Sequence, residues 1–170
     1  TDASQALRYR LLTHRRNHWY VIPRLMVISP GDGRPLHQLL RWLTLLGEAG
    51  APGLLLREPS RPAEAIKAAL DQATERFSFV ALHERCGAID DQRVQATHLK
   101  SSSSPRRSGP FGQSCHTKED LDATFEAGAA YAFLSPVFPP SSKPDDSRSP
   151  LGLALYLRNA TARPVLALGG

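Results

Sequence analysis

The chain has 170 residues, of which 41% are hydrophobic, and carries a formal net charge of +5 at neutral pH. This length and apolar content suffice for one well-buried core and are too small for two ordinary domains. No apolar run reaches membrane-spanning length, and the first residues lack the charged-then-apolar order of a secretory signal, so we expect a cytoplasmic protein without a membrane partner. Two cysteines, Cys86 and Cys115, are too few for a disulfide scaffold, and we expect reduced thiols.

The positive charge raises the question of a nucleic-acid partner, and the placement of the basic residues decides it. They gather in an N-terminal cluster and in a serine-rich loop, namely at Arg8, Arg10, His14, Arg15, Arg16 and His18, and at Arg106 and Arg107. Neither cluster is interleaved with the aromatic side chains that stack on single-stranded nucleic acid. We therefore expect solvated charges and no nucleic-acid partner.

The first predicted element is a helix over residues 4–16, because alanines and leucines recur there on one helical side. Pro23 ends this pattern. We accordingly divide the chain into an N-terminal helical extension, residues 1–24, and a main domain, residues 25–170.

The main domain opens with a short apolar run over residues 25–29, closed by Pro30-Gly31-Asp32-Gly33. An uninterrupted apolar run before a turn is typical of a strand buried on both faces in a parallel sheet. Strands and helices then alternate at about 25 residues per unit, as successive βα units do. Further strands are predicted at 53–57, 77–83, 97–99, 111–114, 131–135 and 164–168, and helices at 36–49, 62–76 and 118–127.

Seven predicted strands fit either an open doubly wound sheet or an eight-stranded barrel. Polar residues favour the barrel, because they follow most of the strands instead of gathering at one switch point. They are Arg57-Glu58, His83-Glu84, His98, Ser114, His116, Ser135 and Gly169-Gly170. We predict an α/β fold, a (β/α)8 TIM barrel that lacks its last βα unit and has reduced helices after strands three and four.

Several motifs follow one another along the second half of the chain. They are Gly112-Gln113-Ser114-Cys115-His116-Thr117, Glu126-Ala127-Gly128-Ala129-Ala130-Tyr131, Ser135-Pro136-Val137-Phe138, Ser141-Ser142-Lys143 and Pro164-Val165-Leu166-Ala167-Leu168-Gly169-Gly170. Leu56-Arg57-Glu58 and Thr97-His98-Leu99 extend the pattern toward residue 25. In this order the motifs resemble those of thiamine phosphate synthase and of its paralogue, the TenI-type thiazole tautomerase.

The synthase joins an aminopyrimidine diphosphate to a thiazole phosphate and needs Mg²⁺ for the diphosphate. The resemblance predicts Gln and Lys around the Leu-Arg-Glu core, where Leu55 and Pro59 stand, and Asn-Asp where His83 and Glu84 stand. Glu84 remains the metal ligand of this alternative. The second acidic ligand falls near Ser103, whose neutral hydroxyl is a poor ligand for Mg²⁺.

The same departures bring the chain nearer to the tautomerase, whose loop after the fourth strand is similar to Leu99-Lys100-Ser101-Ser102-Ser103-Ser104-Pro105. Its reaction moves one proton on a thiazole carboxylate phosphate and needs an acid/base group and a phosphate anchor, but no metal or other cofactor. The resemblance implies His116 as the acid/base group, with Ser114 beside it. The implied substrate-binding and phosphate-binding residues are Arg57, His83, Ser135, Lys143, Gly169 and Gly170.

Several of these residues also have an alternative interpretation as purely structural groups. His116 also suits a hydrogen bond at a helix start, Arg57 an ion pair with Glu58, and His83 and His98 inward-facing polar positions. A dyad of Cys115 with His116 is disfavoured, because adjacent strand residues point to opposite faces.

Three functions follow in order of preference: a TenI-type isomerase that acts on a phosphorylated thiazole, thiamine phosphate synthase, and a non-catalytic protein that binds a phosphorylated ligand. Whether the chain forms a homo-oligomer stays open.

Overall fold

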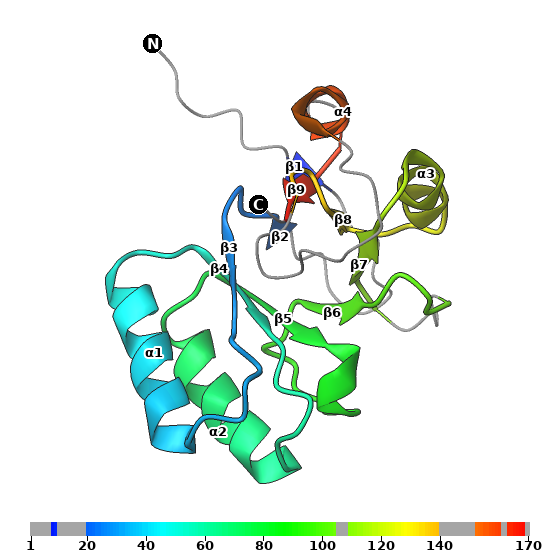
Figure 1. Cartoon of the computed structure of the whole chain (residues 1–170). Helices are drawn as coiled ribbons and strands as arrows, with labels where there is room; N and C mark the ends of the chain where they lie inside the picture. Colours follow the sequence, from blue (N-terminus) through cyan, green and yellow to red (C-terminus); the bar gives the residue numbers. More distant parts are fainter. Residues whose placement is uncertain (1–7, 10–19, 105–108, 140–151, 161–162, 169–170) are drawn as a thin grey trace. The chain divides into compact units, whose positions relative to one another are not determined.

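The fold was obtained as a computed structural model that describes residues 8–9, 20–104, 109–139, 152–160 and 163–168. The chain divides into two compact units, the N-terminal unit Thr1–His98 and the C-terminal unit Leu99–Gly170, which are taken in turn (Figure 1). Three of the predicted site residues, Lys143, Gly169 and Gly170, lie outside the described residues.

The N-terminal unit contains parallel strands, and helices cross between the first three of them (Figure 1). In chain order the elements are β3 (Met26–Ile28), α1 (Leu36–Glu48), β4 (Gly53–Leu56), α2 (Ala63–Thr74), β5 (Phe79–His83) and β6 (Ala96–Leu99). Every residue of β4 and β5 is buried, as expected of parallel strands covered on both faces.

The core of this unit forms where α1 and α2 pack side by side against alternate residues of β4 and β5. The buried side chains come from both helices and both strands, and include Leu39, Leu43, Leu54, Leu56, Ile66, Leu70, Val80 and Leu82. Burying a leucine or isoleucine of this kind contributes about 1.5–3 kcal/mol, so this cluster fixes the strand ends and the loops that follow them.

Two predictions about helices meet different outcomes in this unit. Only the short 3₁₀ helix η1 (Glu84–Cys86) connects β5 and β6, which confirms the reduced helix after the third strand. The predicted N-terminal helix is not found at the two residues described within it, because β1 (Arg8–Tyr9) pairs antiparallel with β2 (Tyr20–Val21). The rest of the predicted helix lies outside the described residues.

The C-terminal unit contains three parallel strands, β7 (Phe111–Cys115), β8 (Tyr131–Leu134) and β9 (Val165–Ala167), with α3 (Lys118–Glu126) after β7 and α4 (Gly152–Ala160) before β9. Between β6 and β7 the described residues form no helix, as predicted. Helix α4 was not predicted. The core of the C-terminal unit consists of side chains from the strands and from α3, namely Cys115, Leu121, Ala132, Leu134 and Val165.

Within each unit the strands lie in chain order, β3-β4-β5-β6 in the first and β7-β8-β9 in the second. A doubly wound sheet reverses its strand order at a switch point, and neither unit contains such a reversal. The predicted parallel α/β organisation is therefore confirmed. Among the described helices, none has both the length and the apolar character needed to cross a membrane.

Gly112 marks a close approach between β7 and β8. It lies in register with the fully buried Tyr131, and a Cβ atom at Gly112 would stand only 2.2 Å from Cζ of that ring. The ring is held further by an edge contact with Phe133, with 5.7 Å between the ring centroids. Only glycine therefore fits opposite Tyr131.

We expect Gly112→Ala to lower the free energy of unfolding by about 1–3 kcal/mol, the usual cost of overpacking a core. Chemical denaturation measures it. Tyr131→Leu, which removes most of the ring, should absorb much of this cost, so that the double variant is more stable than the sum of the two single effects. Additive effects would contradict the close contact.

Candidate functional site

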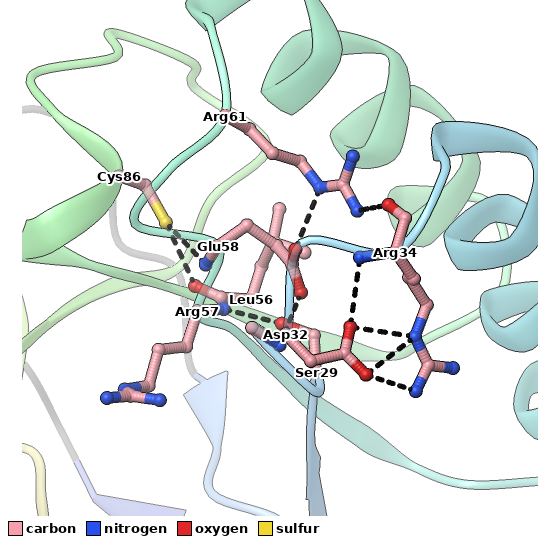
Figure 2. Close-up of polar contacts among 9 residues, drawn as sticks. Ser29, Asp32, Arg34, Leu56, Arg57, Glu58, Arg61 and Cys86 are labelled. Carbon is pink, nitrogen blue, oxygen red and sulfur yellow. Dashed lines mark hydrogen bonds and ion pairs between the residues drawn. The ribbon is translucent and has the colours of Figure 1, made fainter.

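The loops after β3 and β4 are tied to each other through Ser29, whose bond with Arg57 is drawn in Figure 2. The Ser29 N–H donates to the Leu55 carbonyl oxygen at 3.0 Å, and the Arg57 N–H donates to the Ser29 hydroxyl at 2.7 Å. Because parallel strands end at the same edge, these bonds hold both loops at the carboxyl ends of β3 and β4.

Glu58 is a buried carboxylate at the centre of these loops, with 1% of its surface exposed. It accepts the Gly31 N–H at 2.9 Å and pairs with Nε of Arg61 at 2.8 Å. Nη2 of Arg61 donates in turn to the Arg34 carbonyl oxygen at 2.5 Å. A buried charge is tolerated only when it is paired and hydrogen-bonded, and both conditions hold for Glu58.

Arg57 stands next to Glu58 in the chain but does not pair with it. Figure 2 shows the Arg57 guanidinium directed away from the Glu58 carboxylate, which faces Arg61. Among the described residues no carboxylate forms an ion pair with the half-buried Arg57. The alternative of an ion pair between Arg57 and Glu58 is therefore wrong.

Cys86 and Asp32 complete this network without offering reactive groups. The Cys86 thiol accepts the Glu58 N–H at 3.2 Å and donates to the Leu56 carbonyl oxygen at 3.5 Å, and burial raises its pKa. Hydrogen bonds from Arg34 lower the pKa of Asp32 to about 2. Both residues therefore hold the loops in place.

His83 is the last residue of β5 and His98 the penultimate residue of the neighbouring strand β6, and the two lie in register with each other. Their ring centroids are 5.6 Å apart, and both side chains are buried. Nδ1 of His83 accepts the Arg85 N–H at 3.1 Å, which caps η1. Burial, with a smaller contribution from His83, lowers the pKa of His98 to about 3. His98 is thus neutral at physiological pH and fills an inward-facing position.

The residues implied for a magnesium site do not fit one. Glu84 is half-buried in η1, and the residue before it offers an imidazole nitrogen, whereas Mg²⁺ takes oxygen ligands. No group of three His, Cys, Asp or Glu side chains within the described part of the chain is placed to hold a metal ion.

His116 lies in the C-terminal unit at the junction of β7 and α3. Its N–H donates to Oδ2 of Asp120 at 2.9 Å, and its Nδ1 lies 2.8 Å from the Ser135 carbonyl oxygen after β8. The helix start is fixed by a capping box between Thr117 and Asp120. The structure thus brings together His116 and Ser135, both implied by the resemblance.

The contact with Ser135 determines which ring nitrogen of His116 carries the proton. A carbonyl oxygen only accepts hydrogen bonds, so Nδ1 must be the donor in the neutral ring. The lone pair is then on Nε2, which is the form that a general base needs. The Ser135 hydroxyl lies 3.3 Å from the same Nδ1 atom and adds a second contact.

Ser114 and Cys115 point to opposite faces of β7, as their alternation predicts. Cys115 is fully buried in the core beneath α3, where burial raises the pKa of its thiol. Ser114 is half-buried on the face that bears Tyr131 and Phe133 on the neighbouring strand. The thiol is therefore a core group and the serine is the polar residue of this strand end.

Gln113 is a site residue that sequence reasoning missed. Its buried side-chain NH₂ donates to carbonyl oxygens of the serine loop, at 2.8 Å to Ser103 and 3.2 Å to Lys100. Its carbonyl oxygen accepts the hydroxyl of Thr124 on α3 at 3.3 Å. A polar residue at a buried strand position was the available signal, because such a group requires partners.

Comparison with known proteins matches residues 93–170 to the family model described as thiamine monophosphate synthase. This segment belongs to the thiamine phosphate synthase and TenI superfamily. Among solved structures, the chain is similar to a thiamine phosphate pyrophosphorylase from Pyrococcus furiosus, with 19% sequence identity and a TM-score of 0.66 over 86% of this chain and 75% of that one. At this identity the likeness shows the fold, parallel α/β and consistent with part of a TIM-like barrel. No curated protein matches the chain.

We expect Gln113→Leu to release the serine loop, since it removes the donor shared by the loop carbonyl groups. Amide hydrogen exchange over residues 100–104 should become at least about tenfold faster, which corresponds to about 1.4 kcal/mol. Thr124→Val is the matched control, because it removes the other partner of Gln113 and leaves the loop contacts in place. Unchanged exchange in Gln113→Leu would contradict this role.

Stability should depend on pH through His98. Its folded-state pKa, about 3, lies below its ordinary value of 6.5, so the unfolded state binds the proton more tightly. The stabilisation is therefore present above pH 6.5 and is lost as the pH falls toward 3, with a slope of up to about 1.4 kcal/mol per pH unit.

The free energy of unfolding, measured by chemical denaturation at several pH values between about 3 and 6.5, should depend less steeply on pH in His98→Leu than in the wild type. His37→Leu, at an exposed position on α1, provides the control. An equal slope in His98→Leu and the wild type would show that another group carries the dependence.

Proposed function

We propose that the protein is an enzyme of thiamine biosynthesis that moves a proton on a thiazole carboxylate phosphate to give the aromatic isomer, as TenI-type tautomerases do. The superfamily supports the pathway. The observation that carries the reaction type is the hydrogen bond between Nδ1 of His116 and the Ser135 carbonyl oxygen. We further propose that the fold is a TIM-like (β/α) barrel and that the protein is cytoplasmic.

In the proposed reaction, Nε2 of His116 removes the proton from the substrate, and the resulting imidazolium returns it to the position that completes the aromatic ring. The carbonyl oxygen of Ser135 favours this step, because it accepts a hydrogen bond from Nδ1–H in both the neutral ring and the imidazolium, and it stabilises the positive charge of the imidazolium. Ser114, from the strand before His116, is assigned to substrate binding.

We assign the phosphate of the substrate to Arg57, which follows β4 in the N-terminal unit. Substrate-binding or phosphate-binding roles are also proposed for His83 in the same unit, and for Ser135, Lys143, Gly169 and Gly170 in the C-terminal unit. Arg57 supports this assignment because its guanidinium forms no ion pair within the described residues. Arginine matches the geometry of a phosphate with two parallel N–H donors. The other assignments rest on the resemblance.

The second candidate is thiamine phosphate synthase, and it is favoured by the name of the solved structure that shares the fold. Its reaction depends on Mg²⁺, for which Glu84 is the carboxylate in the expected place. Because His83 and Glu84 do not fit the ligand preference of Mg²⁺, we rank this reaction second and propose no metal cofactor.

The proposal is tested by following the conversion of the non-aromatic thiazole carboxylate phosphate to its aromatic isomer by NMR, in deuterated water. We expect turnover by the wild type and a loss of at least about 100-fold in kcat in His116→Ala, the usual contribution of a general base. His37→Ala, an exposed histidine, should retain full activity.

A parallel reaction with an aminopyrimidine diphosphate, thiazole phosphate and Mg²⁺ separates the candidates. Formation of thiamine phosphate would replace the isomerase with the synthase. Binding of the thiazole compound without either reaction would indicate a non-catalytic binding protein, and full isomerase activity in His116→Ala would remove the proposed base.

A further inference from the structure

Arg57 and Glu58 are neighbours of opposite charge that follow β4. A carboxylate that pairs with Arg57 would compete directly with a phosphate for the same N–H donors. An arginine assigned to phosphate therefore needs its neighbouring carboxylate to be engaged elsewhere.

The structure engages Glu58 through Arg61, three residues further along the chain, across the turn that precedes α2. The ion pair is buried on both sides, with 10% of the Arg61 side chain and 1% of the Glu58 side chain exposed. Gly31 N–H occupies the other carboxylate oxygen, and the Arg34 carbonyl oxygen orients the Arg61 guanidinium. Figure 2 shows the result, with Glu58 turned toward Arg61 and the Arg57 guanidinium on the other side.

Gly31 makes this arrangement compact. It adopts a φ of +62°, and a Cβ atom there would lie 2.6 Å from the Arg57 carbonyl oxygen. Glycine is thus required both for the turn and for its close approach to the backbone of Arg57. The loop after β3 consequently brings its N–H donor to the carboxylate of Glu58.

We propose that Arg61 is a positioning residue for Arg57. By holding the carboxylate of Glu58, Arg61 keeps it from pairing with Arg57 and leaves the Arg57 guanidinium to a phosphate monoester. This inference rests on the phosphate-binding role given to Arg57 under the proposed function.

A contribution to stability explains the buried ion pair of Glu58 with Arg61 less well than the positioning role does. Replacement of a buried ion pair by apolar groups of similar size is often neutral or stabilising, whereas removal of one partner leaves an uncompensated charge. If Arg61 is lost, the nearest cation to which Glu58 can turn along the chain is Arg57. Removal of Arg61 should therefore weaken phosphate binding through Arg57, and removal of both charges should restore it.

The experiment measures the affinity for inorganic phosphate by calorimetry and by the shift of the thermal unfolding midpoint. We expect Arg61→Met to bind phosphate about tenfold more weakly than the wild type, the size of one lost charge-assisted contact. The double variant Glu58→Gln, Arg61→Met should return to within about twofold of the wild type, because the glutamine oxygen still accepts the Gly31 N–H and carries no charge. Arg57→Ala should be weak whichever residue stands at position 61.

The last comparison distinguishes positioning from a general loss of structure. In an Arg57→Ala background, Arg61→Met should have no further effect on affinity, whereas a merely structural role would lower affinity in both backgrounds. Should Arg61→Met not fold, Arg61→Lys takes its place, with a smaller loss that Glu58→Gln restores.

The outcomes separate this inference from the function on which it rests. If Arg57→Ala binds phosphate as well as the wild type, the phosphate role of Arg57 fails and the inference fails with it. If Arg57→Ala is weak while Arg61→Met is unaffected, or if the double variant is not restored, only the role of Arg61 is overturned.

Discussion

Parallel pairing of the strands is the constraint on which the rest of the structure depends. Every strand of a parallel unit ends at the same edge, so side chains far apart in sequence meet there, while the crossover helices cover a face. In the N-terminal unit this edge joins the loops after β3 and β4, and it places His83 in register with His98. In the C-terminal unit it places His116 beside Ser135. The candidate site residues therefore lie at strand ends and in loops whose positions the buried strands determine.

Buried polar groups at these strand ends are held mainly by backbone partners. Glu58 accepts a backbone N–H, His116 donates to a backbone carbonyl oxygen, and Gln113 donates to several. Backbone partners move little, and an unpaired buried polar group is costly, so each contact restricts its side chain to one orientation. No buried side-chain nitrogen or oxygen within the described residues lacks a hydrogen-bond partner. The polar side chains at these strand ends are thereby held in defined orientations.

The strands and most helices were predictable because burial in a parallel unit leaves short apolar runs between turn residues. β4 and β5 followed from this pattern, and α3 was predicted over nearly the same residues as those observed. Helix α4 was missed, because the prolines and serines that precede it hid the apolar periodicity of its nine residues. The pairing at Arg8–Tyr9 contradicts the helix expected there, since propensity at an N-terminal segment yields to strand pairing with Tyr20–Val21.

The site was less predictable, because motifs identify residues and not their partners. Arg57, His116 and Ser135 were found by resemblance, whereas the roles of Arg61 and Gln113 depend on contacts that only the folded chain shows. Adjacency in sequence suggested Arg57 as an alternative partner of Glu58, whereas in the fold Arg61, three residues further along, faces the carboxylate. The motif Leu56-Arg57-Glu58 therefore indicated charged residues at the end of the strand. Only the fold shows that the charge of Glu58 is paired with Arg61.

The structural and catalytic interpretations of His116 are compatible rather than exclusive. The hydrogen bond to Ser135 uses Nδ1, and the bond to Asp120 uses the backbone N–H, so neither of these two contacts involves Nε2. A histidine that orients a helix start can thus present the basic nitrogen of its neutral ring in a fixed direction. The same bond that anchors the ring also fixes its tautomer, and a fixed tautomer is what proton transfer at neutral pH requires.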